Sequence, residues 1–334
     1  MRTILLIATG GTIASRPTAA GGLAPAITSQ ELLSCVPELA EFCRIDTIQL
    51  YNLDSTNMGP EQWQGIAAAV QENYDRYDGF VITHGTDTMG YTAAALSYMI
   101  QKSPKPVVLT GSQKSIYNRD TDARNNLWRA VAYACHPDAW GVQIVFDNQV
   151  ILGTRARKTR TKSFNAFSSI DYPETAMFRD RRLIQFLQRP AEYTHAVFST
   201  ALDPNVFVLR LVPGMRADII PMLEGRYRAL VLESFGVGGI PQQLMDAFAA
   251  GLGDYETTHK VLIMTTQVTY EGSDVGVYEV GKRVRNRFRF LEAHDMTIEA
   301  VVTKSMWLLA QNCDSFDQLQ QRFYRQVNFD TFYH

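Results

Sequence analysis

Two short motifs combine threonine with glycine or aspartate, each directly after an apolar segment typical of a buried strand. The first is ATGGTIAS, residues 8–15, in which Thr12 follows a pair of glycines. The second is THGTDT, residues 83–88, in which two threonines flank Asp87. A threonine hydroxyl is a weak nucleophile that needs a base or a buried charge relay beside it. The two motifs together therefore raise the hypothesis of threonine-based catalysis.

A glycine-rich turn after a strand can also hold a phosphate group. A P-loop has a lysine after its last glycine, whereas Gly11 is followed by Thr12 and Ile13. A dinucleotide-binding turn has three spaced glycines, whereas the glycines of this motif are adjacent. Phosphate binding is therefore the weaker hypothesis, and a tight turn with a purely structural role stays open on this motif alone.

The second motif has a structural alternative, because a helix expected over residues 89–102 begins directly after it. Threonine and aspartate are favoured at helix N-caps, and on this segment alone the N-cap is the preferred interpretation. The aspartate could instead orient a lysine or bind an ammonium group. We expect His84 to be a packed histidine, because no carboxylate or second histidine stands at metal-ligand spacing.

A basic segment could supply the lysine. Residues 153–164, GTRARKTRTKSF, carry five cations, a pattern usually found on a solvated face or at a nucleic-acid site. If the segment is a strand at a sheet edge, some cations point inward, where burial is costly without a partner such as Asp87. A desolvated lysine has a lowered pKa and can act as a base. The pattern does not say which cation points inward.

The bulk composition is that of an ordinary globular protein. The chain has 334 residues, 46% of them hydrophobic and 20% charged, with a net charge of −2. This length predicts two domains with a sizeable core, and the charge balance predicts neither a nucleic-acid nor a membrane partner. The apolar run 4–8 is too short for a secretory signal, so we expect a cytoplasmic protein.

The cysteines predict neither disulfides nor a zinc site. None of the four forms a CxxC pair or stands at zinc-ligand spacing to a histidine. Scattered single thiols are typical of small buried hydrophobes in a reducing compartment. These cysteines are Cys35, Cys43, Cys135 and Cys313.

Alternation of apolar strands with helices predicts an α/β fold whose parallel sheet is covered on both faces. The expected elements of the first domain are strands over 3–8, 79–83 and 106–111, helices over 60–78, 89–102 and 121–135, and a hairpin over 142–154 that turns at Asp147-Asn148. After about residue 165 we expect a linker with a possible hairpin. The second, smaller domain is expected to contain strands over 207–214, 228–236 and 260–267 and helices over 241–252 and 296–311.

The sequence thus divides into an N-terminal α/β catalytic domain over 1–188, a linker over 189–205 and a C-terminal α/β domain over 206–334. In open α/β sheets, ligands bind beyond the carboxyl ends of the strands. Five polar or glycine-rich segments leave expected strand ends and could line one crevice. They are residues 8–15, 51–58, 81–92, 109–115 and 233–241.

With these motifs assembled, the chain resembles the bacterial L-asparaginases of the cytoplasmic type I group. The resemblance covers nearly the whole chain and rests on TGGTI followed by HGTDT, with LDSTNM, KPVVLTGSQ, GTRARK and ESFGVGG. It implies a two-domain fold with a larger N-terminal parallel-sheet domain and a smaller C-terminal α/β domain. It also implies a homo-oligomer, either a dimer or a dimer of dimers.

The resemblance implies an amidohydrolase that converts L-asparagine to L-aspartate and ammonia without a metal or organic cofactor. Thr12 matches the nucleophile, which would form a β-aspartyl-threonine intermediate. Thr86, Asp87 and Lys158 match the family's relay. Backbone N–H groups of Gly11 and Thr86 are expected to stabilise the oxyanion.

The resemblance also implies how a zwitterionic substrate is held. Asp54 and Ser55 match the pair that binds the α-carboxylate, with Thr56 beside them, and Asp87 is expected to contact the α-ammonium. In much of the family a tyrosine in the loop after TGGTI contacts the nucleophile, and here Leu23 stands in that stretch. We hypothesise that Tyr278 fills its place.

Several other functions are compatible with parts of the pattern. A mixed asparaginase-glutaminase is close, because one methylene in a pocket is worth only ~1–3 kcal/mol. An asparaginase-like subunit of a tRNA-dependent amidotransferase would carry an extra N-terminal domain, which this sequence is expected to lack. A non-catalytic amino-acid-binding protein predicts a broken relay, and a nucleic-acid binder using residues 155–162 predicts a basic domain; neither fits this sequence.

Overall fold

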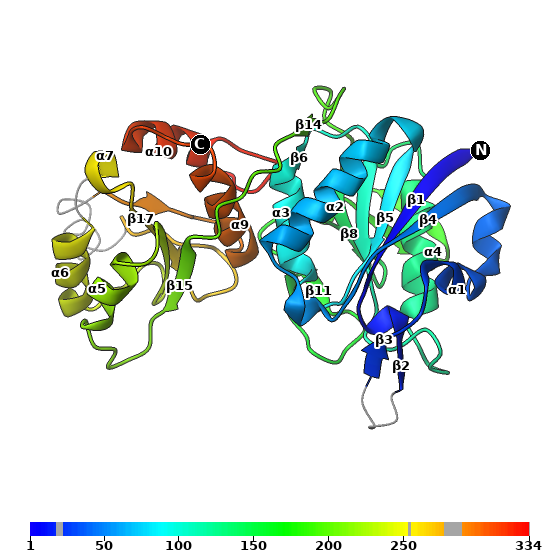
Figure 1. The fold of residues 1–334 in the computed structure, drawn as a ribbon, viewed down its shortest axis with the longest axis horizontal. Helices are drawn as coiled ribbons and strands as arrows, with labels where there is room; N and C mark the ends of the chain where they lie inside the picture. The colour runs from blue at the N-terminus through cyan, green and yellow to red at the C-terminus, as the bar shows by residue number, and fades with distance from the viewer. Residues whose placement is uncertain (18–22, 253–254, 277–288, 334) are drawn as a thin grey trace. The chain divides into compact units, whose positions relative to one another are not determined.

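A computed structural model describes residues 1–17, 23–252, 255–276 and 289–333 of the chain. They divide into two compact units, Met1–Thr200 and Ala201–His334. Each unit is an α/β domain built around its own sheet (Figure 1).

The N-terminal unit is built on an eight-stranded sheet with the strand order β13-β12-β9-β8-β7-β5-β1-β4. Its neighbouring strands from β8 to β4 are parallel, and those from β8 to β13 are antiparallel. The bounds are β1 Arg2–Gly10, β4 Cys43–Leu53, β5 Gly79–Thr83, β7 Pro106–Thr110, β8 Gly141–Phe146, β9 Gln149–Leu152, β12 Ala176–Arg179 and β13 Arg182–Gln185.

The sheet is therefore mixed, with the expected parallel strands from β8 to β4 and the predicted hairpin at the start of its antiparallel side. Only two residues separate β8 from β9, and Asp147 adopts a left-handed φ of 53°. A two-residue connection can only reverse the chain, because a parallel return needs a crossover of a dozen or more residues. The stretch expected as a linker with a hairpin contains β12 and β13, which extend this same sheet.

Helices cover both faces of this sheet, as the alternation of strands and helices predicted (Figure 1). One face of β1 buries Ile4, Leu6 and Ala8 in a cluster that includes residues of α1 (Ser29–Ser34) and α4 (Ala123–Ala134). Helices α2 (Pro60–Asn73) and α3 (Met89–Met99) pack on each other and lie on the opposite face. This division follows from the alternating side-chain direction along a strand.

Two of these helices are shorter than the sequence predicted. Helix α2 ends at Asn73 and is followed by a 3-10 turn, η4, over Tyr74–Arg76. Helix α3 ends at Met99, and the next residues form β6 (Ile100–Gln101), which pairs with β14 (Val197–Phe198).

The C-terminal unit contains a four-stranded parallel sheet with the order β15-β16-β17-β18. Helices α5 and α6 pack on each other, and α9 packs on β15, β16 and α10. The bounds are β15 Val206–Arg210, α5 Ile219–Glu224, β16 Ala229–Ser234, α6 Gln242–Gly251, α7 Tyr255–Thr258, β17 Val261–Thr266, β18 Leu291–Glu292, α9 Ile298–Leu309 and α10 Phe316–Tyr324.

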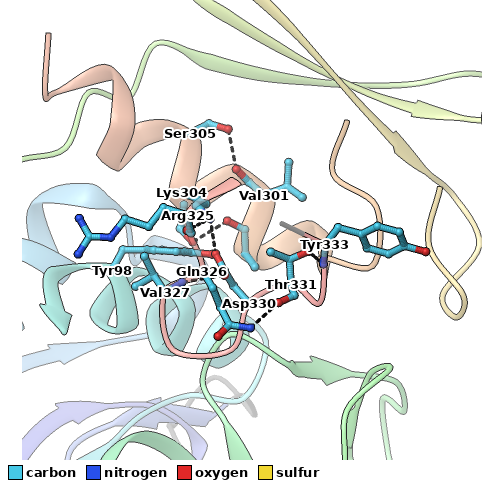
Figure 2. A network of polar contacts seen from close by, with 12 residues as sticks. Tyr98, Val301, Lys304, Ser305, Arg325, Gln326, Val327, Asp330, Thr331 and Tyr333 are labelled. Atoms are coloured by element: carbon cyan, nitrogen blue, oxygen red, sulfur yellow. Dashed lines mark hydrogen bonds and ion pairs between the residues drawn. The ribbon is translucent and has the colours of Figure 1, made fainter. Parts of the chain in front are cut away.

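A buried ion pair fastens the segment after α10 to α9 (Figure 2). Lys304 Nζ donates to Asp330 Oδ2 at 2.6 Å and to the Arg325 carbonyl at 3.1 Å, and both charged side chains are fully buried. The other oxygen of Asp330 accepts the Val327 N–H at 2.9 Å. Burial lowers the pKa of Lys304, while the Asp330 carboxylate opposes that shift. The pair therefore orders the C-terminal residues on the surface of α9.

Candidate active site

The turn after β1 brings the backbone of the first motif against the loop after β5. Gly11 has a φ of 80°, and a Cβ placed on it would lie 2.3 Å from the Gly85 backbone nitrogen. Only glycine fits this position. A residue with a side chain rarely adopts this positive φ, and the Gly85 backbone leaves no space for a Cβ atom. The next residue on each side of this contact is a threonine, Thr12 on η1 (Thr12–Ala14) and Thr86. The structure thus brings together the two threonine motifs.

The loop after β4 joins the same place through η3 (Ser55–Asn57). A Cβ on Gly85 would lie 2.6 Å from the Ser55 Oγ, so the buried Ser55 side chain packs against the second motif. Thr88 Oγ1 donates to the Ser55 carbonyl at 2.7 Å and holds the two loops together. Three carboxyl strand ends therefore meet at the candidate site.

Lys158 is the cation of the basic segment that meets the second motif. It ends the short strand β10 (Ala156–Lys158), and its Nζ lies 2.7 Å from Thr86 Oγ1 and 2.6 Å from Asp87 Oδ1. The Lys158 side chain is 16% exposed, whereas the Asp87 side chain is 62% exposed. A charge-assisted contact of this kind is stronger than one between neutral groups. Thr86, Asp87 and Lys158 thus form one connected polar group.

The helix N-cap interpretation of the second motif is confirmed for the position of Thr88 and is wrong for its side chain. Thr88 occupies the N-cap position of α3, but its side chain makes no capping hydrogen bond. Its hydroxyl is bound to the Ser55 carbonyl instead, and Asp87 is bound to Lys158. The polar side chains of this motif therefore connect loops across the site.

His84 is a packed histidine, as expected. The ring is fully buried, with Nδ1 2.7 Å from the Gly85 carbonyl and Nε2 2.9 Å from Thr92 Oγ1. The carbonyl can only accept, so Nδ1 carries the proton and Nε2 accepts from the Thr92 hydroxyl. Burial lowers the pKa of His84 to about 4. The neutral ring therefore ties the second motif to α3.

The expectation that the Gly11 N–H stabilises an oxyanion was wrong. That N–H already donates to the Leu53 carbonyl at 2.9 Å, which closes the contact between the β1 and β4 loops. An N–H group engaged in a backbone hydrogen bond is not free for a developing charge. The structure gives Gly11 a different role, which is close approach to Gly85.

The remaining predicted site residues are Asp54, Thr56, Leu23 and Tyr278. Asp54 Oδ1 accepts from both the backbone N–H and the hydroxyl of Thr56 at 2.9 Å, and both residues are exposed. Leu23 begins β3 (Leu23–Pro25), which pairs with β2 (Ser15–Pro17) directly after the turn that carries Thr12. Tyr278 lies outside the described residues.

Gln113 is a site residue that the sequence reasoning missed. Thr86 Oγ1 donates to Gln113 Oε1 at 3.2 Å, and Gln113 Nε2 donates to the Ser163 carbonyl at 3.1 Å. The segment 109–115 was expected to line the crevice, but nothing in its pattern singled out the glutamine. Its contact with Thr86 depends on the spacing of β5 and β7, which only the folded sheet supplies.

No group of three or more histidine, cysteine, aspartate or glutamate side chains in the described parts of the chain could hold a metal ion. The cysteines are all free thiols; Cys43 and Cys313 are buried, and Cys35 and Cys135 are partly buried. No helix within the described ranges is long and apolar enough to cross a membrane.

Comparison with known proteins gives matches over both units. Residues 3–192 match the family model "Asparaginase, N-terminal", and residues 205–323 match "Glutaminase/Asparaginase C-terminal domain". The chain is 40% identical over 317 residues to L-asparaginase from Thermococcus kodakarensis, covering 93% of this chain and 94% of that protein. It is 34% identical to L-asparaginase 1 from Escherichia coli K12, covering 94% of each.

The chain is also similar to a solved L-asparaginase structure and to an amidotransferase subunit. The solved structure of the thermostable L-asparaginase from Thermococcus kodakarensis superposes with a TM-score of 0.91 at 36% identity, over 98% of each chain. A subunit of the glutamyl-tRNA(Gln) amidotransferase from Pyrococcus furiosus is 34% identical over 93% of this chain and 73% of its own length. Both family models and these similarities establish that the chain belongs to the asparaginase family.

Proposed function

We propose that this protein hydrolyses the side-chain amide of L-asparagine and releases L-aspartate and ammonia. The observation that carries the proposal is the contact of Lys158 Nζ with both Thr86 and Asp87, in the loop that touches the turn presenting Thr12. The identity to relatives named L-asparaginase, over more than nine-tenths of the chain, supports the same activity.

Thr12 is the proposed nucleophile. Its Oγ1 attacks the side-chain amide carbon, and the new C–O bond creates a tetrahedral oxyanion. The proton lost by the Thr12 hydroxyl is transferred to the amide nitrogen, the C–N bond breaks and ammonia leaves, so that a β-aspartyl ester remains on Thr12. Water then attacks the ester carbon, which releases L-aspartate and restores the Thr12 hydroxyl. Covalent catalysis of this kind replaces one difficult step by two easier ones.

Thr86, Lys158 and Asp87 are the proposed proton relay. The Asp87 carboxylate holds the Lys158 ammonium at 2.6 Å, and the same nitrogen reaches the Thr86 hydroxyl at 2.7 Å. The relay can pass a proton between the reacting groups and Lys158 through the Thr86 hydroxyl. The Asp87 carboxylate stays beside Lys158 as its ion-pair partner throughout. The Thr86 backbone N–H has no hydrogen-bond partner among the described residues and remains our candidate donor to the oxyanion.

A zwitterionic substrate needs an anion receptor and a cation receptor. We propose that Ser55, with Asp54 and Thr56 beside it, binds the α-carboxylate, and that Asp87 binds the α-ammonium. The high exposure of Asp87 supports its second role, because Lys158 is bound to one carboxylate oxygen while 62% of the side chain stays exposed. Tyr278 is proposed as the tyrosine that approaches Thr12.

The finer assignments are also proposals. We infer a cytoplasmic type I enzyme that assembles as a dimer or a dimer of dimers. The similarity to L-asparaginase 1 from Escherichia coli supports the type, and a size-exclusion measurement with light scattering tests the assembly.

The decisive experiment is ammonia release from L-asparagine and L-glutamine over a concentration series. The wild type should hydrolyse L-asparagine, and an acid-quenched sample should contain the β-aspartyl adduct by intact-mass spectrometry. Thr12→Ala should abolish turnover and the adduct while keeping substrate binding by calorimetry. Thr194→Ala, at an exposed position, serves as the matched control. A folded wild type that hydrolyses neither amide would refute the proposal.

A second candidate is an amide-hydrolysing activity that accepts glutamine. The relative from the glutamyl-tRNA(Gln) amidotransferase and the C-terminal family description both favour it. The substrates differ by one methylene, which a pocket distinguishes by only ~1–3 kcal/mol. The ratio of kcat/KM for the two amides in the same experiment decides between the candidates.

A further inference from the structure

The hydrogen bonds of Gln113 determine which way its side-chain amide faces. Nε2 lies 3.1 Å from the Ser163 backbone carbonyl. A carbonyl oxygen can only accept a hydrogen bond, so the NH2 group of the amide must face Ser163. The other end of the amide, Oε1, then faces Thr86 Oγ1 at 3.2 Å. A flipped amide would place two acceptor oxygens against each other at Ser163.

This amide orientation in turn fixes the Thr86 hydroxyl proton. A hydroxyl has one proton and two lone pairs. Because Gln113 Oε1 can only accept, the Thr86 proton must point toward Gln113. The lone pairs are then free to accept, and one of them accepts a hydrogen bond from Lys158 Nζ, which lies 2.7 Å from Thr86 Oγ1. The direction of the Lys158–Thr86 hydrogen bond is therefore set by a residue outside the relay.

Gln113 is itself held from two sides. Its backbone N–H donates to both oxygens of the buried Asp122 carboxylate, at 3.1 and 2.9 Å. Its side chain bonds to Ser163, which lies in the segment between β10 and β11 (Phe167–Ser169) and so follows Lys158 along the chain. One amide thus spans from the loop that carries Thr86 to the segment that follows Lys158.

We infer that Gln113 is a positioning residue that draws the Thr86 hydroxyl proton toward itself, so that the Thr86 oxygen accepts from Lys158, and that holds the Lys158 segment in register with Thr86. The inference rests on the proposed function, because it assigns Gln113 a role in the relay of that reaction. It predicts that loss of the amide slows the chemical step while leaving substrate affinity nearly unchanged, since Gln113 acts through Thr86.

The test compares two variants of Gln113 with a matched control. Gln113→Leu keeps the size of the side chain and removes both hydrogen bonds. It should lower kcat about 10- to 100-fold and change KM by less than about threefold, because the relay loses its orientation. Gln64→Leu is the control, since the Gln64 amide also donates to a backbone carbonyl, at 3.0 Å to Thr200. The control should retain wild-type kcat.

Gln113→Glu adds a pH-dependent readout that a purely structural role would not move. An ionised glutamate presents an oxygen to the Ser163 carbonyl, whereas a protonated one can donate there and still accept from Thr86, as glutamine does. The kcat of this variant relative to wild type should therefore rise as the pH falls from 8 to 5. Wild-type kcat in Gln113→Leu, or an equal loss in the control, would overturn the inference.

Crystal structures keep the inference testable if the wild type releases no ammonia. In Gln113→Leu the Lys158 Nζ to Thr86 Oγ1 distance should exceed hydrogen-bond range, whereas the control should retain the 2.7 Å contact. An unchanged contact in Gln113→Leu would overturn the positioning role whatever the activity. An inactive wild type with a broken contact in the variant would refute the proposed function and leave the positioning role supported.

Discussion

The buried histidine beneath the second motif makes the stability of the N-terminal unit depend on pH. His84 has a pKa of about 4 in the folded protein, because burial disfavours its charged form. In the unfolded chain the ordinary value is about 6.5. As the pH falls below about 6.5, the unfolded state therefore binds the proton and the folded state does not. The folded protein loses stability as the pH falls through this window.

The size of the effect follows from the two pKa values. Between pH 7 and pH 5 this single group should cost the folded state about 2 kcal/mol, and the loss should reach about 3 kcal/mol by pH 4. A substitution by asparagine removes the titrating group, so the variant should lack this part of the pH dependence.

The assay is urea unfolding of wild type and His84→Asn at pH values from 7 to 5, followed by tryptophan fluorescence. Three of the four tryptophans, Trp63, Trp128 and Trp140, lie in the N-terminal unit, so the signal mainly reports on that unit. Wild type should be the more stable protein at pH 7. The difference between the two free energies of unfolding should then shrink by about 2 kcal/mol at pH 5.

The control for this experiment is His195→Asn, because His195 is exposed. Carboxylates that titrate in the same range contribute equally to wild type and variant, and they cancel in the difference. A difference between wild type and His84→Asn that stays constant from pH 7 to pH 5 would refute the reasoning. Direct titration of the His84 ring by NMR gives a second measurement, and a value near 6.5 would contradict burial as the cause.

Three further predictions concern the contacts around the site and the C-terminal pair. Gly11→Ala should destabilise the protein by about 2 kcal/mol or more beyond Gly141→Ala, as urea unfolding can measure, because both glycines have positive φ but only Gly11 abuts another backbone. Equal losses would contradict the close-contact argument. Lys158→Met should lower kcat for asparagine about 10²- to 10⁴-fold with an unchanged circular dichroism spectrum; near wild-type turnover would remove Lys158 from the relay. Lys304→Met should destabilise the protein by about 3–5 kcal/mol in thermal or urea unfolding, because the Asp330 carboxylate stays buried after its cationic partner is removed. A loss below about 1 kcal/mol would show that the pair is not buried in solution.

The sequence predicted the order and type of most elements. Apolar runs and helical periodicity gave the strand over 79–83 with its observed bounds, and they placed α3 and α4 within a few residues of their observed ends. The hairpin at Asp147 was also predicted. These features depend on local pattern and turn chemistry, which the sequence displays directly.

The edge of the main sheet was harder to predict from sequence. The segment that forms β12 and β13 carries charge and proline with little periodicity. The edge strand β13 has no buried residue, and β12 buries only two of its four residues. Its pairing with β9 is a contact between distant parts of the chain. Local pattern contains no information on such a partner, so the segment resembled a linker.

The candidate site shows the same division between sequence and tertiary structure. Residue types and motif spacing raised threonine-based catalysis at the two motifs and argued against a phosphate loop. The resemblance to the asparaginases then implied the roles of Thr12, Thr86, Asp87 and Lys158. Only the folded sheet decided which basic side chain meets Asp87, because that choice depends on how β10 lies against the β5 loop. The folded structure also engaged the Gly11 N–H with Leu53.

Gln113 marks the limit of what the sequence by itself determined. Its importance comes from two hydrogen bonds, to Thr86 and to Ser163, whose partners lie 27 and 50 residues away along the chain. The sequence determined which groups could do chemistry and which strand ends would present them. The tertiary structure decided the directions of the hydrogen bonds among them. A hydrogen bond depends on the distance and the angle between its donor and its acceptor, and these are set only after the parallel strands have paired into the complete sheet.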